Sequence, residues 1–253
     1  MRGNVWGWGM KGAVVSIWMG LLIAAGAPAE GKDVKQSLAL PGKTFAWTFQ
    51  ADTLGQKPAH SVAFGGNWQV LEDSTSMAPS STAPPAVADS AAASAPPSLA
   101  APARRFLTQS ESDDGIAFHY LAFTRPTLED LDASVRFRIR SGEIDPSAGL
   151  LFQMDRKGTS GYLVRVSGRT GQLSFHYLLY GKRRDVKFAK IGPLTPGAWH
   201  TLAVQRRKSL LRVLYDGKEL ITVRDDRFSR GTVGVWTEDD TLVDFSDLTA
   251  TAR

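Results

Sequence analysis

The chain has 253 residues, of which 43% are hydrophobic, so it is long enough to bury the core of a sizeable domain. It contains no cysteine, which excludes disulfide bonds and thiolate metal sites. The formal net charge of +5 is small for this length, and the basic residues are scattered along the chain. The sequence therefore lacks the charge pattern of a nucleic-acid-binding protein, and we expect no nucleic-acid partner.

The first 29 residues have the composition of a secretory signal peptide. Arg2 and Lys11 precede the apolar stretch AVVSIWMGLLIAAG, and Ala27-Pro28-Ala29 supplies small residues at the spacing of a cleavage site. An uncleaved membrane anchor is the alternative, but the apolar stretch is short for a bilayer span. After cleavage the mature chain would have a net charge of +3 and no membrane anchor. It would be released into the periplasm or to the exterior.

Residues 74–103 break the pattern of the chain, because they are almost entirely Ala, Pro, Ser and Thr. Such a segment has too few large apolar groups to offset the entropy of ordering, so we expect a disordered loop. It could link two domains. However, the mature residues before it predict only two or three strands, too few for a domain. We therefore predict one domain over residues 30–253, with residues 74–103 as a surface insertion.

The rest of the chain predicts strand after strand. The segment ASVRFRIRSG alternates Val135, Phe137 and Ile139 with three arginines, which is the period of a strand. Asp216-Gly217, between LLRVLY and KELITV, is the strongest short signal for a β-hairpin. Further short segments of the same type are AGLLFQMD, GYLVRVSG, QLSFHYLLYG, WHTLAVQRR, GTVGVW and TLVDFSDL. The pattern predicts an all-β sandwich or barrel.

Five motifs in order resemble a known family. From about Phe45 onward, AGLLFQMD, GYLVRV, PGAWHTLAV, LYDGKEL and VGVWTEDDTLVDFSDL resemble the secreted bacterial 3-keto-disaccharide hydrolase domains, formerly a domain of unknown function. These are concanavalin A-like jelly rolls related to laminin-G-like modules. The resemblance implies two antiparallel sheets with one concave face, and cleavage of disaccharides oxidised at C3. Gln153 and Ser160-Gly161-Tyr162 depart from the residues that many relatives have at these places.

Strand alternation assigns side chains to the two faces of the predicted sheets. We expect the following residues to point into the core: Phe137, Ile139, Leu150, Phe152, Met154, Tyr162, Val164, Val166, Phe175, Tyr177, Leu179, Val233 and Val235. The opposite face carries Arg138, Gln153, Arg165, His176 and Trp236. If these strands share one sheet, the five side chains form a sugar-binding surface, with Trp236 as an aromatic plate at the edge of the concave sheet.

Each of these residues also has an ordinary structural interpretation. Arginines on strands are usually solvated, Gln153 is as readily surface as ligand, and a single histidine such as His176 is more often hydrogen-bonded than functional. Trp236 could instead cover the edge of the sandwich. The cluster Lys182-Arg183-Arg184 follows Gly181 on a hairpin. It could meet an acidic glycan at the rim of a cleft, or it could be a solvated turn.

Acid–base chemistry on a glycoside requires paired carboxyl groups, or one carboxyl group and an activated water. The candidates at strand ends are Asp155, Glu238, Asp239 and Asp240. Asp240 matches an acidic position in the closing motif of the family, so it is the first candidate, with Asp155 as the second. The alternative for Asp240 is a turn residue that accepts backbone hydrogen bonds. No segment has the spacing of a calcium loop, a phosphate-binding loop or a nucleophile elbow, so we predict no cofactor and no metal.

Two functions of different classes follow from these patterns. The first is an exported jelly roll that engages a carbohydrate ligand, with hydrolysis of a 3-keto-disaccharide or related glycoside as the activity that the resemblance implies. The alternative is a non-catalytic, laminin-G-like module of the cell envelope that binds a glycan or a protein. A structural envelope protein without a ligand is a third hypothesis.

Overall fold

The computed structural model describes residues 40–73, 104–114 and 117–253. The predicted signal peptide at residues 1–29 and the predicted insertion at residues 74–103 lie outside these residues. All described residues belong to one compact unit, Gln36–Arg253. Within them the chain forms strands and turns but no helix, and therefore no helix with the length and apolar character that crossing a bilayer requires.

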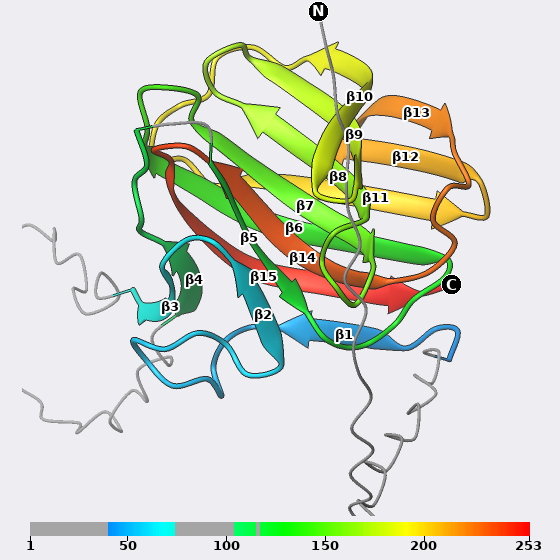
Figure 1. The fold of residues 1–253 in the computed structure, drawn as a ribbon, viewed down its shortest axis with the longest axis horizontal. Coiled ribbons are helices and arrows are strands. Elements are labelled where there is room, and N and C mark those ends of the chain that lie inside the picture. The colour runs from blue at the N-terminus through cyan, green and yellow to red at the C-terminus, as the bar shows by residue number, and fades with distance from the viewer. Residues whose placement is uncertain (1–39, 74–103, 115–116) are drawn as a thin grey trace, which may run out of the picture. The chain divides into compact units, whose positions relative to one another are not determined.

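The strands form two antiparallel sheets (Figure 1). Sheet 1 has the order β13-β12-β11-β6-β15-β4-β3, and β1 also pairs with β15. Its strands are β1 (Thr44–Trp47), β3 (Trp68–Glu72), β4 (Arg105–Gln109), β6 (Leu131–Ser141), β11 (His200–Arg207), β12 (Leu210–Tyr215), β13 (Lys218–Arg224) and β15 (Leu242–Ala252).

Sheet 2 has the order β10-β9-β8-β7-β14-β5-β2. Its strands are β2 (Ser61–Phe64), β5 (Phe118–Phe123), β7 (Ser147–Met154), β8 (Gly161–Ser167), β9 (Gln172–Leu179), β10 (Lys182–Lys190) and β14 (Thr232–Glu238). The all-β jelly-roll fold expected from the sequence is therefore confirmed. The predicted hairpin is also present, because Tyr215 pairs with Lys218 across Asp216-Gly217 and both turn residues have positive φ.

The main hydrophobic core lies between the two sheets. Most residues that alternation assigned to the interior belong to it: Phe137, Leu150, Phe152, Tyr162, Val164, Val166, Phe175, Val233 and Val235 are buried there, and Ile139 and Tyr177 are partly buried against it. A second, smaller cluster lies on the outer face of sheet 2 and contains Leu151, Met154, Leu163, Leu178 and Trp236. Sheet 2 is thus apolar on both faces near its centre.

Two of the interior assignments are wrong. Met154 belongs to the outer cluster, because Gln153 has a φ of 53° and β7 carries one extra residue opposite the segment between Thr232 and Gly234. Such a bulge reverses the alternation beyond it. Leu179 is 41% exposed, because it is the last residue of β9 before the turn at Tyr180.

Residues 74–103 connect β3 and β4, which are neighbouring strands in sheet 1. Glu72 pairs with Arg105 and Trp68 with Gln109, so the chain leaves and re-enters the sheet at the same place. The assignment of residues 30–253 to a single domain with an insertion stays a prediction.

We predict that the loop between β7 and β8 depends on the absence of a side chain at Gly158. A Cβ atom there would lie 2.2 Å from Cζ of Phe64, and the φ of Gly158 is +67°. Gly181 has a similar φ of +74° but nothing within 4 Å, so it is a matched control. Gly181→Ala should lower the free energy of unfolding by about 1–2 kcal/mol through backbone strain alone. Gly158→Ala should cost a further ~1–3 kcal/mol from overpacking. Urea denaturation measures both, and equal losses would contradict the contact.

Candidate functional site

Three of the five predicted site residues share the outer face of sheet 2. Trp236 on β14 pairs with Gly149 on β7, Gly149 pairs with Arg165 on β8, and Arg165 pairs with Ser174 on β9. His176 lies two residues further along β9, on the same face. The structure thus brings together Arg165, His176 and Trp236.

The other two residues, Arg138 and Gln153, do not lie on this face, so their expected positions are wrong. Arg138 lies on β6, which belongs to sheet 1, so its side chain projects from the opposite side of the sandwich. Gln153 is the bulged residue of β7, and its Nε2 donates to the carbonyl oxygen of Glu129, at 2.6 Å, just before β6 of sheet 1. Alternation along a single strand does not give the sheet to which Arg138 belongs, and the bulge interrupts the alternation at Gln153.

Sheet 2 is strongly curved, and its outer face is concave. Nη1 of Arg183 on β10 lies 2.7 Å from Oε2 of Glu238 on β14, although β9, β8 and β7 separate these strands. Four spacings between strands amount to about 19 Å in a flat sheet. An arginine and a glutamate side chain together are shorter than this. The sheet therefore bends so that β10 approaches β14 across the face that carries Arg165 and Trp236.

Four charged groups meet on the concave face. Arg165 contacts the carboxylates of both Asp145 and Glu238, and its Nη2 donates to Oγ of Ser147 at 2.8 Å. Arg183 is the second guanidinium group on Glu238. Arg165 and Glu238 are buried, whereas about a quarter of the Arg183 and Asp145 side chains is exposed. Arg165 and Glu238 therefore form the buried part of the cluster, and Arg183 and Asp145 form its solvent-accessible part.

The indole ring of Trp236 lies beneath these charges. Cζ of Arg165 and Cζ of Arg183 are 5.8 and 5.6 Å from its centroid, and the Phe118 ring is 5.6 Å away. Trp236 faces away from the main core, as expected, but β14 lies between β7 and β5 and is not at the edge. Its ring is fully buried, so it packs against the two arginines and has no exposed ring face on which a ligand could stack.

Burial controls the protonation of two groups on this face. Desolvation raises the pKa of Glu238, although Arg165 and Arg183 act in the opposite direction. Desolvation also lowers the pKa of His176 to about 4, helped by the positive charge of Arg183 and opposed by Asp185. The imidazole is therefore neutral at pH 7. Its Nδ1 lies 2.9 Å from Oδ1 of Asp185, which assigns the proton to Nδ1 and leaves Nε2 as an acceptor.

Three buried polar atoms on this face have no hydrogen-bond partner among the described residues. They are Nε1 of Trp236, Nε of Arg165 and Nε2 of His176. The first two are donors and the third is an acceptor. Buried polar atoms in folded proteins nearly always have partners, so these three atoms require ordered water, or a ligand that displaces it, to complete their hydrogen bonds.

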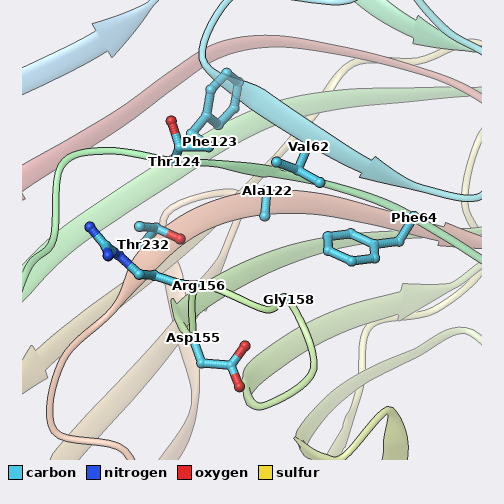
Figure 2. A pocket seen from close by; sticks show the side chains of 9 residues that line it. All are labelled: Val62, Phe64, Ala122, Phe123, Thr124, Asp155, Arg156, Gly158 and Thr232. Carbon is cyan, nitrogen blue, oxygen red and sulfur yellow. The ribbon is translucent and has the colours of Figure 1, made fainter. Parts of the chain in front are cut away.

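A pocket of about 240 Å³ lies on the same face, near the end of β7 that is opposite to the charged cluster (Figure 2). Its apolar wall comes from β2 and β5, and its polar wall from the β7–β8 loop and the start of β14. The lining residues are Val62, Phe64, Ala122, Phe123, Thr124, Asp155, Arg156, Gly158 and Thr232. The hydroxyl group of Tyr120 donates to the carbonyl oxygen of Gly158 at 2.7 Å, and the Tyr120 and Phe64 rings stack. This bridge separates the pocket from Trp236.

The two predicted catalytic aspartates both accept hydrogen bonds from loop backbone. Asp155 accepts from N and Oγ1 of Thr159, at 2.8 and 3.0 Å. Asp240 accepts from the amides of Glu143 and Ile144. These loops lie at opposite ends of β7, and eight residues of a strand span about 25 Å. Paired carboxyl groups of glycosidases lie about 5–10 Å apart, so Asp155 and Asp240 do not form such a pair.

Asp145 carries no recognisable signal in the sequence, Arg183 lies in what looks like a basic turn cluster, and Glu238 is one of several acids at strand ends. No local pattern distinguishes these three residues, because their contacts join strands that are far apart in sheet 2. No group of three or more His, Asp or Glu side chains arranged to hold a metal ion occurs in residues 40–73, 104–114 and 117–253.

Comparisons with known proteins support the fold. The chain matches no family model, and no curated protein matches it. The family resemblance from its motifs therefore stays a prediction. Among solved structures, it is similar to the carbohydrate-binding module CBM66 from Bacillus subtilis, with a TM-score of 0.52 and 17% identity over 58% of this chain and 86% of that one. This likeness supports the β-sandwich fold of two antiparallel sheets.

Two further solved structures are similar to the chain at lower TM-scores. The VIP36 exoplasmic/lumenal domain, in a Ca²⁺/Man3GlcNAc-bound form, has a TM-score of 0.48 and 13% identity over 58% of this chain and 78% of that one. A Bacillus subtilis protein of unknown function with a galectin-like fold has a TM-score of 0.45 and 12% identity over 58% and 84% of the two chains.

We predict that His176 makes stability depend on pH between about 4 and 6.5. In this range the unfolded chain binds a proton that the folded protein excludes, because the folded pKa of about 4 lies below the usual 6.5. Stability should therefore fall as the pH drops through this range, by up to about 3 kcal/mol for this group. Urea unfolding at pH 7 and pH 4 measures the difference.

His176→Gln should remove this part of the pH dependence, because glutamine carries no titrating group. His60→Gln, which replaces an exposed imidazole, is the control for the loss of one histidine and should leave the dependence in place. An unchanged pH dependence in His176→Gln would show that the imidazole is not shielded from protonation.

Proposed function

We propose that this protein is an exported carbohydrate-binding domain whose ligand occupies the concave face of sheet 2. The observation that carries the proposal is the set of unpaired polar atoms on Trp236, Arg165 and His176, next to the charged groups of Arg183 and Asp145, about a quarter of whose side chains is exposed. This set combines fixed donors and acceptors on one surface.

The mixture of donors and acceptors favours a polyhydroxy ligand. The N–H groups of Trp236 and Arg165 require an acceptor, whereas Nε2 of His176 requires a donor. A sugar hydroxyl group is both. A simple anion satisfies only the donors, and a metal cation satisfies only the imidazole nitrogen. The carboxylate of Asp145 and the guanidinium group of Arg183 add a charged acceptor and a charged donor at the rim.

The pocket in Figure 2 provides a second place for a sugar ring on this face. Its volume of about 240 Å³ is below the range of pockets that bury drug-sized molecules, and suits one small ring. Its apolar wall at Val62 and Phe64 fits the C–H face of a sugar, and Thr124 and Thr232 bring hydroxyl groups. The similar fold of a carbohydrate-binding module from Bacillus subtilis supports the proposal at the level of the fold.

Ligand binding is tested with a glycan array of neutral and acidic oligosaccharides, followed by calorimetry on the strongest binder. Arg183→Gln should weaken binding about 10- to 100-fold, because it removes a charge-assisted donor. Arg184→Gln is the matched control, since its exposed side chain lies one residue further along β10 on the opposite face. Equal affinity of the two variants would place the ligand elsewhere.

Trp236→Phe gives a narrower test of the same face. Phenylalanine retains an aromatic ring for Arg165 and Arg183 but lacks the indole N–H. If the ligand accepts a hydrogen bond from Nε1, affinity should fall about 3- to 10-fold, as expected for one neutral hydrogen bond. Circular dichroism and urea unfolding establish that the variant is folded, and unchanged affinity in a folded variant would remove Nε1 from the site.

Hydrolysis of 3-keto-disaccharides, which the family resemblance implies, is the second candidate function. Its structural support is the pair of carboxyl groups of Glu238 and Asp145, which both contact Arg165 but differ in burial, and desolvation raises the pKa of Glu238. Product detection by NMR with 3-keto-disaccharides tests turnover. Glu238→Gln should then abolish it. Asp240→Asn and Asp155→Asn test the two sequence-based candidates, and activity in both would exclude them.

Export to the periplasm or the exterior forms part of the proposal and rests on residues 1–29. Expression of the full chain in a bacterium, followed by cell fractionation and N-terminal sequencing, tests it. A mature protein beginning near residue 30 outside the cytoplasm is expected, whereas an intact N-terminus in the cytoplasm would contradict it.

A further inference from the structure

We propose that the outer face of sheet 1 is a separate binding surface for an acidic polysaccharide. The surface consists of Arg104, Arg136, Arg138 and Arg140 with Trp199 and two aspartates, and we name it the arginine face. It lies on the opposite side of the sandwich from the concave face, so it does not depend on the function proposed for sheet 2.

Strand alternation places the arginines on one surface. Arg136, Arg138 and Arg140 alternate along β6, and the inward residues between them belong to the core. β15 lies beside β6, where Asp244 pairs with Arg138, and β4 lies beyond β15, where Thr108 pairs with Asp244. Arg104 directly precedes β4. Four guanidinium groups therefore project from β6 and from the start of β4, which lie on either side of β15.

A buried carboxylate fixes two of the guanidinium groups. Asp244 is only 1% exposed, and its Oδ2 accepts from Nε and Nη2 of Arg138, at 3.1 and 2.8 Å. Its Oδ1 contacts Nε of Arg140 at 3.0 Å and accepts from Oγ1 of Thr108 at 2.7 Å. Nη2 of Arg140 also donates to Oγ1 of Thr108. Both arginines are thus held through their Nε and Nη2 atoms.

Asp247 and Trp199 fix the remaining groups. Asp247 contacts Arg104 and lies 3.4 Å from Nη1 of Arg136, and its side chain is 40% exposed. The ring centroid of Trp199 lies 4.7 Å from Cζ of Arg138 and 5.2 Å from Cζ of Arg136. Packing against an aromatic ring and pairing with carboxylates reduce the freedom of arginine side chains. Binding a ligand therefore costs less conformational entropy here than on mobile arginines.

The charge of this surface indicates the kind of ligand. Four arginines face two aspartates, so the cluster retains a net charge of +2. Each guanidinium group has five N–H donors, and the contacts with the aspartates and Thr108 use only part of them. Between about a quarter and half of each arginine side chain is accessible. The surface therefore suits carboxylate groups, which guanidinium groups bind in a bidentate manner.

The exposed Asp247 favours an acidic polysaccharide over a nucleic acid. A polysaccharide of uronic acids presents hydroxyl groups between its carboxylates, and an accessible aspartate accepts hydrogen bonds from these hydroxyl groups. The same aspartate repels a continuous phosphate backbone. In addition, Arg136 and Arg138 already pack against Trp199, so the indole ring is not free to stack on bases.

The test measures binding of the protein to polygalacturonate at several NaCl concentrations, with neutral dextran and duplex DNA as comparison polymers. The protein should bind polygalacturonate with an affinity that falls as salt rises, and it should not bind dextran. The double variant Arg104→Gln/Arg136→Gln should bind at least 10-fold more weakly and with a shallower dependence on salt. Both residues contact Asp247, which is 40% exposed, and not the buried Asp244, so the variant should remain folded, and urea unfolding tests this.

Arg184→Gln removes one charge from β10 and should leave polygalacturonate binding unchanged. Arg183→Gln, which alters the concave face, should also leave it unchanged, so failure of the sheet 2 proposal is distinguishable from failure of this one. The proposal is overturned by absent polygalacturonate binding, by tighter binding of DNA, or by equal affinity of the double variant.

Discussion

The burial of Glu238 within sheet 2 is the constraint on which the concave face depends. A carboxylate in an apolar setting is unstable unless charged or hydrogen-bonding partners reach it, and its partners here come from β8 and β10. Both guanidinium groups reach one carboxyl group only in a curved sheet. The contacts of Glu238 therefore require the curvature of the sheet. The same curvature places the β9–β10 hairpin so that Arg183, together with Arg165, covers the Trp236 ring. Removal of one arginine would leave charge uncompensated at the centre of the face.

Gly149, at the centre of this face, is needed for the same packing. A Cβ atom at Gly149 would lie 2.8 Å from Cδ1 of Leu163, 2.9 Å from the carbonyl oxygen of Val164 and 3.3 Å from Cβ of Trp236. The absence of a side chain at this position lets the indole ring and Arg165 lie over β7. The outer cluster of sheet 2 is consequently packed as closely as a core, although it carries charged groups at its surface. Such packing holds the unpaired donors of Trp236 and Arg165 in fixed positions, which is what selective recognition of a ligand requires.

Local periodicity predicted the fold well, because the strands turn alternate side chains into the core between the two sheets. Phe137, Val164 and Val235 lie in the core for this reason, and Asp216-Gly217 forms its hairpin because both residues adopt positive φ. The site was harder to predict. Alternation gives the face of a residue within its own strand, but the assignment of β6 to sheet 1 depends on pairing between distant segments. Arg138 was therefore placed on the wrong side of the sandwich.

The bulge at Gln153 and the contacts of Glu238 show two further limits of sequence patterns. One residue with a left-handed backbone reverses the alternation at the end of β7, and no turn residue such as glycine marks the place. The acids near the end of β14 look equivalent in sequence. However, Asp240 accepts hydrogen bonds from the backbone of the β6–β7 loop, whereas Glu238 forms ion pairs with two arginines. Their difference arises from the curvature of the whole sheet.

The charged groups are more deeply buried on the concave face than on the arginine face. This difference affects the kind of ligand that each face could bind. On the concave face the partners of Glu238 and Arg165 are themselves partly or fully buried, so a ligand there has to complete hydrogen bonds in a dry setting, where geometry decides affinity. On the arginine face only Asp244 is buried, and the guanidinium groups around it remain open to water. Interactions there are screened by salt and tolerate variation in the ligand. A selective site and a broad electrostatic surface can therefore coexist on one small domain, because the core between the sheets separates them.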